Sequence, residues 1–330
     1  MSAPRVGVIG AGSLGYHHVR LLRDMPNVAF AGFYDIDATR AATVEAELGA
    51  TAAPSLTALL DRVDAVTVVV PTPAHHAVAK QALARGVHVL IEKPITTSLD
   101  EADDLLATAR ATQALVQTGH VERFNRAIRA ALPHIAEPRF VESNRLAPFN
   151  PRGSDVAVVL DLMIHDIDLV RTLVGGHVVE LAAAGVPVLT PSVDIANARL
   201  GFDSGAVANI TASRVSRDRF RKLRIFQRSG YLSLDLAQGT GEFYRLRGDL
   251  DMGALAAAPR QLEDFMERVP LDAAEGEPLR LELESFVAAV QGIQPVLVTG
   301  EDGRQALEVA LRIMHAIERS MPVLAGSPGA

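Results

Sequence analysis

The segment DLMIHDIDLV, residues 161–170, places three aspartates and a histidine within an otherwise apolar stretch. On a helix, Asp161, His165 and Asp168 stand at positions i, i+4 and i+7, so their side chains share one face. A carboxylate one turn from an imidazole is the arrangement that proton transfer requires. Two other interpretations remain open on these residues alone. The stripe could be a solvated helix face, or the three side chains could bind a metal, although the sequence supplies no further ligand cluster.

A glycine-rich motif near the N-terminus indicates a dinucleotide site. The motif G-x-G-x-x-G consists of Gly10, Gly12, Ser13, Leu14 and Gly15, with one alanine after the first glycine. Its glycines permit a tight turn and let backbone N–H groups approach a pyrophosphate. A second apolar segment ends at Asp35, twenty residues after Gly15, where a carboxylate can bind the ribose hydroxyls of adenosine. Because Asp35 would repel a 2′-phosphate, the sequence predicts NAD rather than NADP. The alternative is a glycine turn followed by an unrelated acid.

Strand-like and helix-like patterns alternate through the first 120 residues. After the first two strands we expect a helix at 39–48, a strand at 65–71, a helix at 75–85, a strand at 87–94, a helix at 99–111 and a strand at 114–119. Alternation of this kind predicts a doubly wound parallel sheet, a Rossmann fold, whose ligands bind at the carboxyl ends of the strands.

Polar residues follow three of these strands. They are Thr72 and His75 after one strand, Glu92 and Lys93 after the next, and residues 117–120 after the last. We predict that the first four contact the cofactor, although His75 could equally cap its helix. Lys93 is the only lysine between Lys80 and Lys222, and the alternative for it is a solvated lysine at a strand end.

After residue 120 the pattern becomes mostly strand-like. We expect strands at 138–145, 177–189, 195–202, 206–214, 220–228 and 230–235, forming an open, mostly antiparallel sheet with a helix at 156–174. The predicted domains are a Rossmann domain at 1–120, a substrate-binding and oligomerisation α+β domain at 121–300, and a C-terminal helix at 301–320.

Composition narrows the class of protein. A chain of 330 residues can form two domains, and a net charge of −7 argues against general nucleic-acid binding. The chain has no cysteine, which excludes disulfides and thiolate metal sites and agrees with a reducing compartment. The sequence shows no signal-peptide pattern and no apolar run of membrane-spanning length, so we expect a cytoplasmic protein that does not enter a membrane.

Several of these motifs together resemble one enzyme family. GAGSLG at 10–15, the strand-end Asp35, PTPAHH at 71–76 and above all EKP at 92–94 are similar to the glucose–fructose oxidoreductase and inositol dehydrogenase (Gfo/Idh/MocA) family of NAD(P)-dependent enzymes. In that family a later helix carries D-x-x-x-H, which Asp161 and His165 match. The resemblance runs through nearly the whole chain.

The resemblance implies roles for three residues and a cofactor. It implies that Lys93 holds the reacting hydroxyl beside the nicotinamide of NAD and that His165 takes the hydroxyl proton. Asp161 would orient the substrate hydroxyl or the imidazole, and the last helix would pack on the nucleotide domain. The chain departs from the family in having VAVVL before Asp161 instead of a glycine run, and Pro151-Arg152 instead of a Trp-Arg pair.

The sequence also suggests a substrate class. The stretch 214–227, RVSRDRFRKLRIFQ, is strongly basic in an acidic protein, which suits an anionic substrate such as a sugar nucleotide, or else a solvated strand or a subunit-facing sheet edge. This stretch, GHVERFN at 119–125 and residues 151–170 resemble UDP-N-acetylglucosamine 3-dehydrogenases of lipid A assembly, which oxidise the sugar 3-hydroxyl to a ketone. The expected substrate-binding residues are Arg123, Asn125, Arg152, Asp161, His165 and Arg214.

Two other functions remain open. An inositol or free-sugar dehydrogenase would not need the arginines, and a non-catalytic dinucleotide sensor would not need a base beside a lysine. We also expect a homodimer or homotetramer, because a broad, half-apolar sheet face favours pairing between copies.

Overall fold

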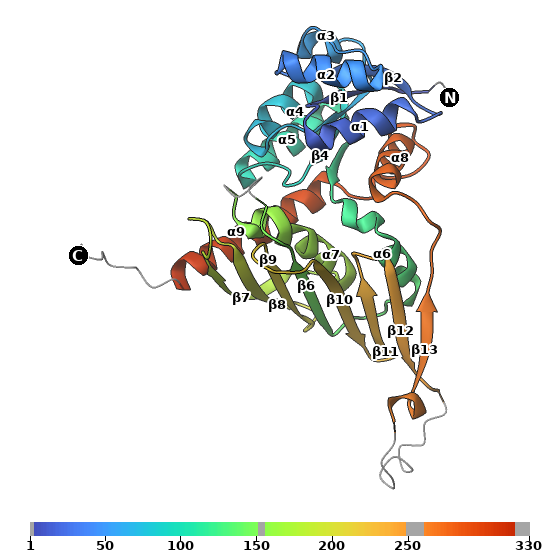
Figure 1. Cartoon of the computed structure of the whole chain (residues 1–330), viewed down its shortest axis with the longest axis vertical. Coiled ribbons are helices and arrows are strands. Elements are labelled where there is room, and N and C mark those ends of the chain that lie inside the picture. The colour runs from blue at the N-terminus through green and yellow to red at the C-terminus, as the bar shows by residue number, and fades with distance from the viewer. Residues whose placement is uncertain (1–2, 151–155, 249–260, 321–330) are drawn as a thin grey trace, which may run out of the picture. The chain divides into compact units, whose positions relative to one another are not determined.

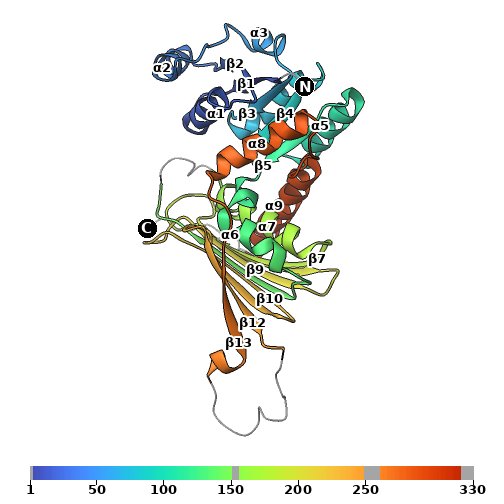
Figure 2. The ribbon, with the colours of Figure 1, turned by 90° about the vertical axis from the view of Figure 1, so that its right-hand side faces the viewer.

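The computed structural model describes residues 3–150, 156–248 and 261–320, and the chain divides into two compact units (Figures 1 and 2). One unit comprises Met1–Phe124 and Gly276–Glu308, and the other comprises Asn125–Glu275 and Val309–Ala330. The first boundary falls at Phe124 instead of residue 120. A second difference is that the segment from Gly276 belongs to the first unit, whereas we predicted that the second domain extends to residue 300.

The first unit is a Rossmann fold with a five-stranded parallel sheet in the order β2-β1-β3-β4-β5. The order reverses at β1, so the carboxyl ends of β1 and β3 flank the crevice in which such sheets bind ligands. The predicted parallel sheet is therefore confirmed. Its strands are β1 (Arg5–Ile9), β2 (Ala29–Tyr34), β3 (Ala65–Val68), β4 (His88–Glu92) and β5 (Val116–Gly119).

Helices lie on both faces of this sheet. Helix α1 begins within the glycine motif, at Ser13, and packs Val19, Leu21 and Leu22 into a core that contains Val6, Val8 and Phe33 of the neighbouring strands. The short α3 was not predicted. The helices of this unit are α1 (Ser13–Arg23), α2 (Ala38–Leu48), α3 (Leu56–Leu60), α4 (His75–Leu83), α5 (Leu99–Thr112) and α8 (Pro278–Val290), with 3₁₀ turns η1 (Thr72–Ala74) and η2 (Val121–Phe124).

Helix α8 joins the first unit through its apolar face. Leu283, Phe286 and Val287 are buried in the same core as the residues of α1. In addition, the Gln117 side-chain amide donates to the Glu282 carbonyl at 3.3 Å. These contacts explain why a helix that follows the strands of the second unit in sequence belongs to the Rossmann unit.

The second unit is built on an eight-stranded sheet in the order β13-β12-β11-β10-β6-β9-β8-β7. Neighbouring strands are antiparallel except for β6 and β9, which run parallel, so the predicted mostly antiparallel sheet is confirmed. Strands β12 and β13 were not predicted. The strands are β6 (Phe140–Leu146), β7 (Val178–Val186), β8 (Ile195–Phe202), β9 (Val207–Ser213), β10 (Phe220–Gln227), β11 (Gly230–Asp235), β12 (Thr240–Leu246) and β13 (Met266–Leu271).

Helices α6 (Arg126–Ala131) and α7 (Ile164–Val174) pack on one face of this sheet (Figure 2). A buried ion pair attaches α7 to β6: Asp166 receives hydrogen bonds from Ser143 at 2.8 Å and from Arg145 Nε at 2.6 Å. The predicted helix at 156–174 is not uniform, because Val159–Met163 forms a π-turn before α7 begins.

Helix α9 (Gly300–Ser320) is divided between the two units. Its first part belongs to the Rossmann unit, where Arg304 pairs with Asp103 of α5 at 2.6 Å. Its later part belongs to the second unit, where Arg312 donates to the Val178 carbonyl at 2.9 Å. Within the described ranges, no helix has the length and apolar character needed to span a bilayer.

Candidate active site

The glycine motif forms the tight turn that the sequence predicted. Gly10 adopts φ +91°, and a Cβ there would lie 2.5 Å from the Val69 carbonyl oxygen. At Gly15 a Cβ would come within 2.0 Å of the Gly10 carbonyl oxygen, so neither position accepts a side chain. A Cβ at Gly12 would instead point into open space. Gly12 thus leaves room for a ligand to approach the backbone at the start of α1, where Ser13 and Leu14 are exposed.

Asp35 connects the end of β2 to this turn. Its carboxylate accepts a hydrogen bond from the Ala11 N–H at 2.6 Å and another from the Asp37 N–H at 2.9 Å. Arg40 of α2 reaches the same turn from the other side and donates from Nε to the Ala11 carbonyl at 2.7 Å.

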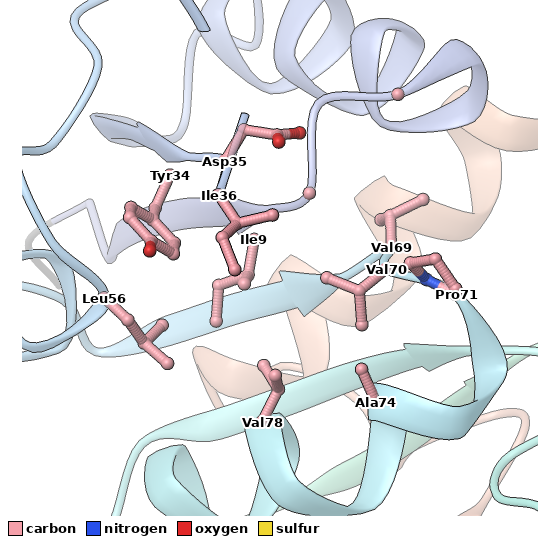
Figure 3. A pocket seen from close by; sticks show the side chains of 12 residues that line it. Ile9, Tyr34, Asp35, Ile36, Leu56, Val69, Val70, Pro71, Ala74 and Val78 are labelled. Carbon is pink, nitrogen blue, oxygen red and sulfur yellow. The ribbon is translucent and has the colours of Figure 1, made fainter. Parts of the chain in front are cut away.

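An apolar cleft of about 340 Å³ opens between the glycine turn, the end of β2 and α4 (Figure 3). Asp35 lies at its rim, and Ile36 beside it is 92% exposed. An apolar cleft beside a carboxylate and a glycine turn has the chemistry to bind an adenosine and its pyrophosphate, so these residues fit NAD. The lining residues are Ile9, Gly10, Gly12, Tyr34, Asp35, Ile36, Leu56, Val69, Val70, Pro71, Ala74 and Val78.

The apolar part of this cleft was not predicted from the sequence. Leu56, Val69 and Val78 come from α3, the end of β3 and α4, and no local pattern distinguishes them from core residues. The only available signal was their position near the carboxyl ends of strands or in the helices that follow.

Lys93 directly follows β4, at the same sheet edge as Thr72 of η1. It is half-buried, and its backbone N–H donates to the Glu92 carboxylate at 3.2 Å. The Lys93-Pro94 peptide is cis. The predicted strand-end placement of Glu92 and Lys93 agrees with the structure.

His75 is placed differently from the prediction. Its ring is 1% exposed and lies between two backbone carbonyls, with Nδ1 2.9 Å from the Pro94 oxygen and Nε2 2.9 Å from the Val70 oxygen. Burial lowers the pKa of the His75 imidazole, although the contacts with the Val70 and Pro94 carbonyls act in the opposite direction. With both nitrogens engaged by backbone, His75 links β3 to the Lys93 segment and does not offer a nitrogen to a cofactor.

In the second unit, Asp161 lies in the π-turn and His165 lies in the first turn of α7. Both side chains are half-buried, whereas Asp166 and Asp168 are buried. π-Turns inside helices occur frequently at functional sites. The stripe Asp161, His165, Asp168 is therefore not a uniformly solvated helix face. Among the described residues, no three His, Asp or Glu side chains gather in a way that could hold a metal ion.

The structure corrects two of the predicted substrate contacts. Arg214 is 4% exposed, and its Nε donates to Asp194 at 2.7 Å, so it serves the fold of the second unit. Asn125 is also buried: its side chain caps α6 by accepting from the Ala127 N–H at 3.0 Å and donates to the Leu236 carbonyl at 2.8 Å.

Two further arginines, Arg123 and Arg152, were predicted to bind substrate. Arg123 is largely buried in the Rossmann unit, where its guanidinium lies 3.5 Å from Asp302. Burial would raise the pKa of Asp302, but the charge of Arg123 and hydrogen bonds from Thr299 more than compensate, so this pKa is lowered. Arg152 lies outside the described residues.

Comparison with known proteins agrees with the fold and the nucleotide cleft. A family described as "Oxidoreductase family, NAD-binding Rossmann fold" matches residues 4–120, and the GFO/IDH/MocA C-terminal domain matches residues 127–233. A UDP-N-acetylglucosamine 3-dehydrogenase from Acidithiobacillus ferrooxidans is 40% identical over 315 residues, which cover 95% of this chain and 97% of that protein. The chain belongs to the Gfo/Idh/MocA family. It is an oxidoreductase that uses NAD.

Individual Gfo/Idh/MocA proteins show how far the similarity reaches. The solved structure of the Acidithiobacillus ferrooxidans enzyme matches with a TM-score of 0.87 and 39% identity, covering 97% of this chain and 99% of that one. A scyllo-inositol 2-dehydrogenase (NAD(+)) from Bacillus subtilis is 27% identical, covering 97% of this chain and 95% of the relative. The Gfo/Idh/MocA resemblance inferred from GAGSLG, Asp35 and EKP is thereby confirmed.

Proposed function

We propose that this protein oxidises the 3-hydroxyl of a UDP-N-acetyl-hexosamine, such as UDP-N-acetylglucosamine, to the 3-keto sugar. The observation that supports this substrate is the 40% identity, over 95% of the chain, to an enzyme named for that reaction. The named inositol 2-dehydrogenase relatives that align along nearly the full chain are only 26–27% identical. A 3-keto sugar nucleotide is a substrate for amination, so we place the reaction in cytoplasmic lipid A precursor assembly.

Three side chains carry the chemistry in this proposal. Oxidation of an alcohol removes a hydride from carbon and a proton from oxygen, and NAD supplies the acceptor for the hydride. The His165 imidazole takes the proton, for which an unperturbed pKa of ~6.5 is well suited. Lys93 donates a hydrogen bond to the alcohol oxygen and stabilises the negative charge that develops there, and Asp161 orients the imidazole or the hydroxyl.

The environments of these residues support their roles. Lys93 follows a sheet strand, and its backbone is hydrogen-bonded to a buried carboxylate, so its position is well defined. Asp161 lies in the π-turn and His165 lies at the start of α7. Asp166, the residue after His165, is held by a buried ion pair with Arg145. Groups held in this manner lose little entropy on reaching the transition state.

Arg221 is a basic residue of the stretch 214–227 that could bind the diphosphate. In β10, Arg221 lies on the same face of the sheet as Leu223, and Lys222 lies on the other face. The partner of Arg221 on the neighbouring strand β6 is Arg145, whose side chain lies on the same face as that of Arg221. Arg145 binds Asp166 of α7, so Arg221 points to the helix-covered face of the sheet. Of Arg214, Arg219 and Arg221, the three arginines expected to bind an anionic substrate, we assign this role to Arg221.

The other face of the sheet supports self-association. No described helix covers it, and it carries an aromatic row across four strands: Phe140, Phe226, Tyr231 and Tyr244, with ring centroids 5.7, 5.3 and 4.7 Å apart in succession. Arg224 lies over this row, 4.8 Å from the Phe226 centroid. We propose that this aromatic row is the contact between copies in a homodimer or homotetramer.

The decisive experiment measures NADH absorbance on incubation of the enzyme with NAD and a panel of compounds. UDP-N-acetylglucosamine should give NADH, whereas free N-acetylglucosamine and myo-inositol should not. The Lys93→Ala variant should bind NAD and give no NADH. Reduction with myo-inositol and not with the sugar nucleotide would establish the inositol dehydrogenase alternative, and NAD binding without turnover of any compound would establish a sensor.

A further inference from the structure

The Rossmann unit contains a buried histidine that the proposed mechanism does not use. His18 of α1 is completely buried, and neither ring nitrogen makes a hydrogen bond to another described residue. A buried polar group without a hydrogen-bond partner destabilises the folded state. A residue that carries this cost calls for a functional explanation.

His18 faces the carboxylate that precedes Lys93. Its Nε2 lies 3.4 Å from Oε1 of Glu92, close enough that a small rotation of either side chain would complete a hydrogen bond. The other carboxylate oxygen of Glu92, Oε2, accepts the Lys93 N–H at 3.2 Å. The Glu92 carboxylate therefore lies between the imidazole of α1 and the backbone N–H of Lys93.

The space around this carboxylate is closely fitted. Gly119, at the end of β5, packs against it, and a Cβ there would lie 2.8 Å from Oε1 and 2.9 Å from Oε2. On the other side of the segment, the Pro94 carbonyl contacts His75. Lys93 is thus held between two buried imidazoles, with one acting through Glu92 and the other acting directly on the backbone.

We infer that His18 is a positioning residue for Lys93, acting through the Glu92 carboxylate. His18 fixes the orientation of the carboxylate, and the carboxylate fixes the backbone from which the Lys93 side chain extends. This inference rests on the proposed role of Lys93. A displacement of about 1 Å in a reacting group can lower turnover by about 100-fold, which is the scale of effect that such positioning controls.

The test uses full-length protein and two readouts. The first is hydrogen exchange of the Lys93 amide, measured without substrate, and the second is kcat with the sugar nucleotide. In His18→Leu, Lys93 amide exchange should rise by about ten-fold or more because the carboxylate is released. In the same variant kcat should fall by about 10- to 100-fold with little change in the Kd of NAD. His18→Gln, whose amide nitrogen can replace Nε2, should restore most of both readouts.

A second variant also displaces the Glu92 carboxylate. Gly119→Ala introduces a methyl group against the far end of the Glu92 side chain, which can move without a change in the backbone, so it should reproduce the effects of His18→Leu. If His18→Leu does not fold, Gly119→Ala decides the question. The matched control is Thr67→Val, which removes another buried polar atom without a hydrogen-bond partner in β3 and should change neither readout.

The outcomes separate this inference from the proposed function. Normal Lys93 amide exchange and normal kcat in folded His18→Leu and Gly119→Ala would overturn the positioning role. If UDP-N-acetylglucosamine gave no NADH with the wild type, the proposed function would fail, while the amide exchange of the variants would still report whether His18 holds the segment.

Discussion

The carboxylate of Asp35 accepts a hydrogen bond from the backbone N–H of Ala11 at 2.6 Å, which joins the end of β2 to the glycine turn after β1. Asp35 is therefore part of the turn as well as a negative charge at the rim of the nucleotide cleft. Because Arg40 donates to the carbonyl of the same alanine, a cation also stands close to this position.

Replacement of Asp35 should alter cofactor preference. The Asp35→Ser variant removes the charge that repels a 2′-phosphate and leaves Arg40 nearby, so NADP binding should strengthen. NAD binding should weaken because the Ala11 hydrogen bond is lost. The Kd of NADP divided by the Kd of NAD, both measured by titration, should fall by about ten-fold or more. If the wild-type protein bound NADP as tightly as NAD, the predicted preference for NAD would be wrong.

Replacement of the proposed base should act on turnover. His165→Ala should lower kcat by ~10²–10⁴ with a smaller change in the KM of the sugar nucleotide, because proton removal occurs in the transition state. NAD binding and the thermal midpoint should remain near the wild-type values. A fully active variant would assign His165 to the fold alone.

The two flanking aspartates provide a comparison for this result. Asp161→Asn should reduce kcat more than Asp168→Asn when both are measured on folded protein. Asp168 is fully buried, so its replacement should appear mainly as a lower thermal midpoint. Equal kcat losses in the two variants would contradict the assignment of Asp161.

Arg214 should contribute to stability and not to substrate affinity. Its partner Asp194 is buried, which alone would raise the carboxyl pKa, but backbone N–H groups of 188–190 and the Arg214 guanidinium lower this pKa well below its usual range. Arg214→Leu should destabilise the protein by about 3–5 kcal/mol, as expected when one member of a buried pair is removed. Arg221→Ala is the matched variant and should instead raise the KM of the sugar nucleotide by about ten-fold or more.

The pH dependence of stability follows from the same pair. Because the pKa of Asp194 is lower in the folded state, its contribution is complete above the unfolded value of about 3.9 and is lost as pH falls below it. Thermal midpoints should therefore drop steeply below about pH 4 in the wild type and less steeply in Arg214→Leu. Parallel pH curves for the two proteins would contradict this account.

The aromatic row should control association. Tyr231→Glu places a charge between Phe226 and Tyr244 and should produce a monomer of 35.1 kDa in light scattering at micromolar concentration. Tyr231→Phe preserves the stacking and should leave the assembly intact. A wild-type protein that is already monomeric would refute the proposed interface.

Local sequence patterns determined much of this protein. The glycine turn has no room for a Cβ at position 10 or position 15, and the G-x-G-x-x-G pattern of the sequence predicts this turn. The alternation of strands and helices in the first 120 residues predicted the parallel sheet because each element buries its own apolar face. Asp35 and EKP could be placed at strand ends for the same reason, since their positions depend on neighbouring residues.

Only the tertiary structure decided the partners of the polar residues. Arg214 and Asn125 read as substrate contacts in the sequence, but sheet register brings Asp194 to the first, and the second caps a helix whose existence was not predicted. His18 shows no distinguishing feature in sequence, and its relation to Glu92 arises because α1 packs beside the end of β4. A charged or polar side chain gains its role from the group that faces it after folding, and that group is set by long-range packing and not by spacing along the chain.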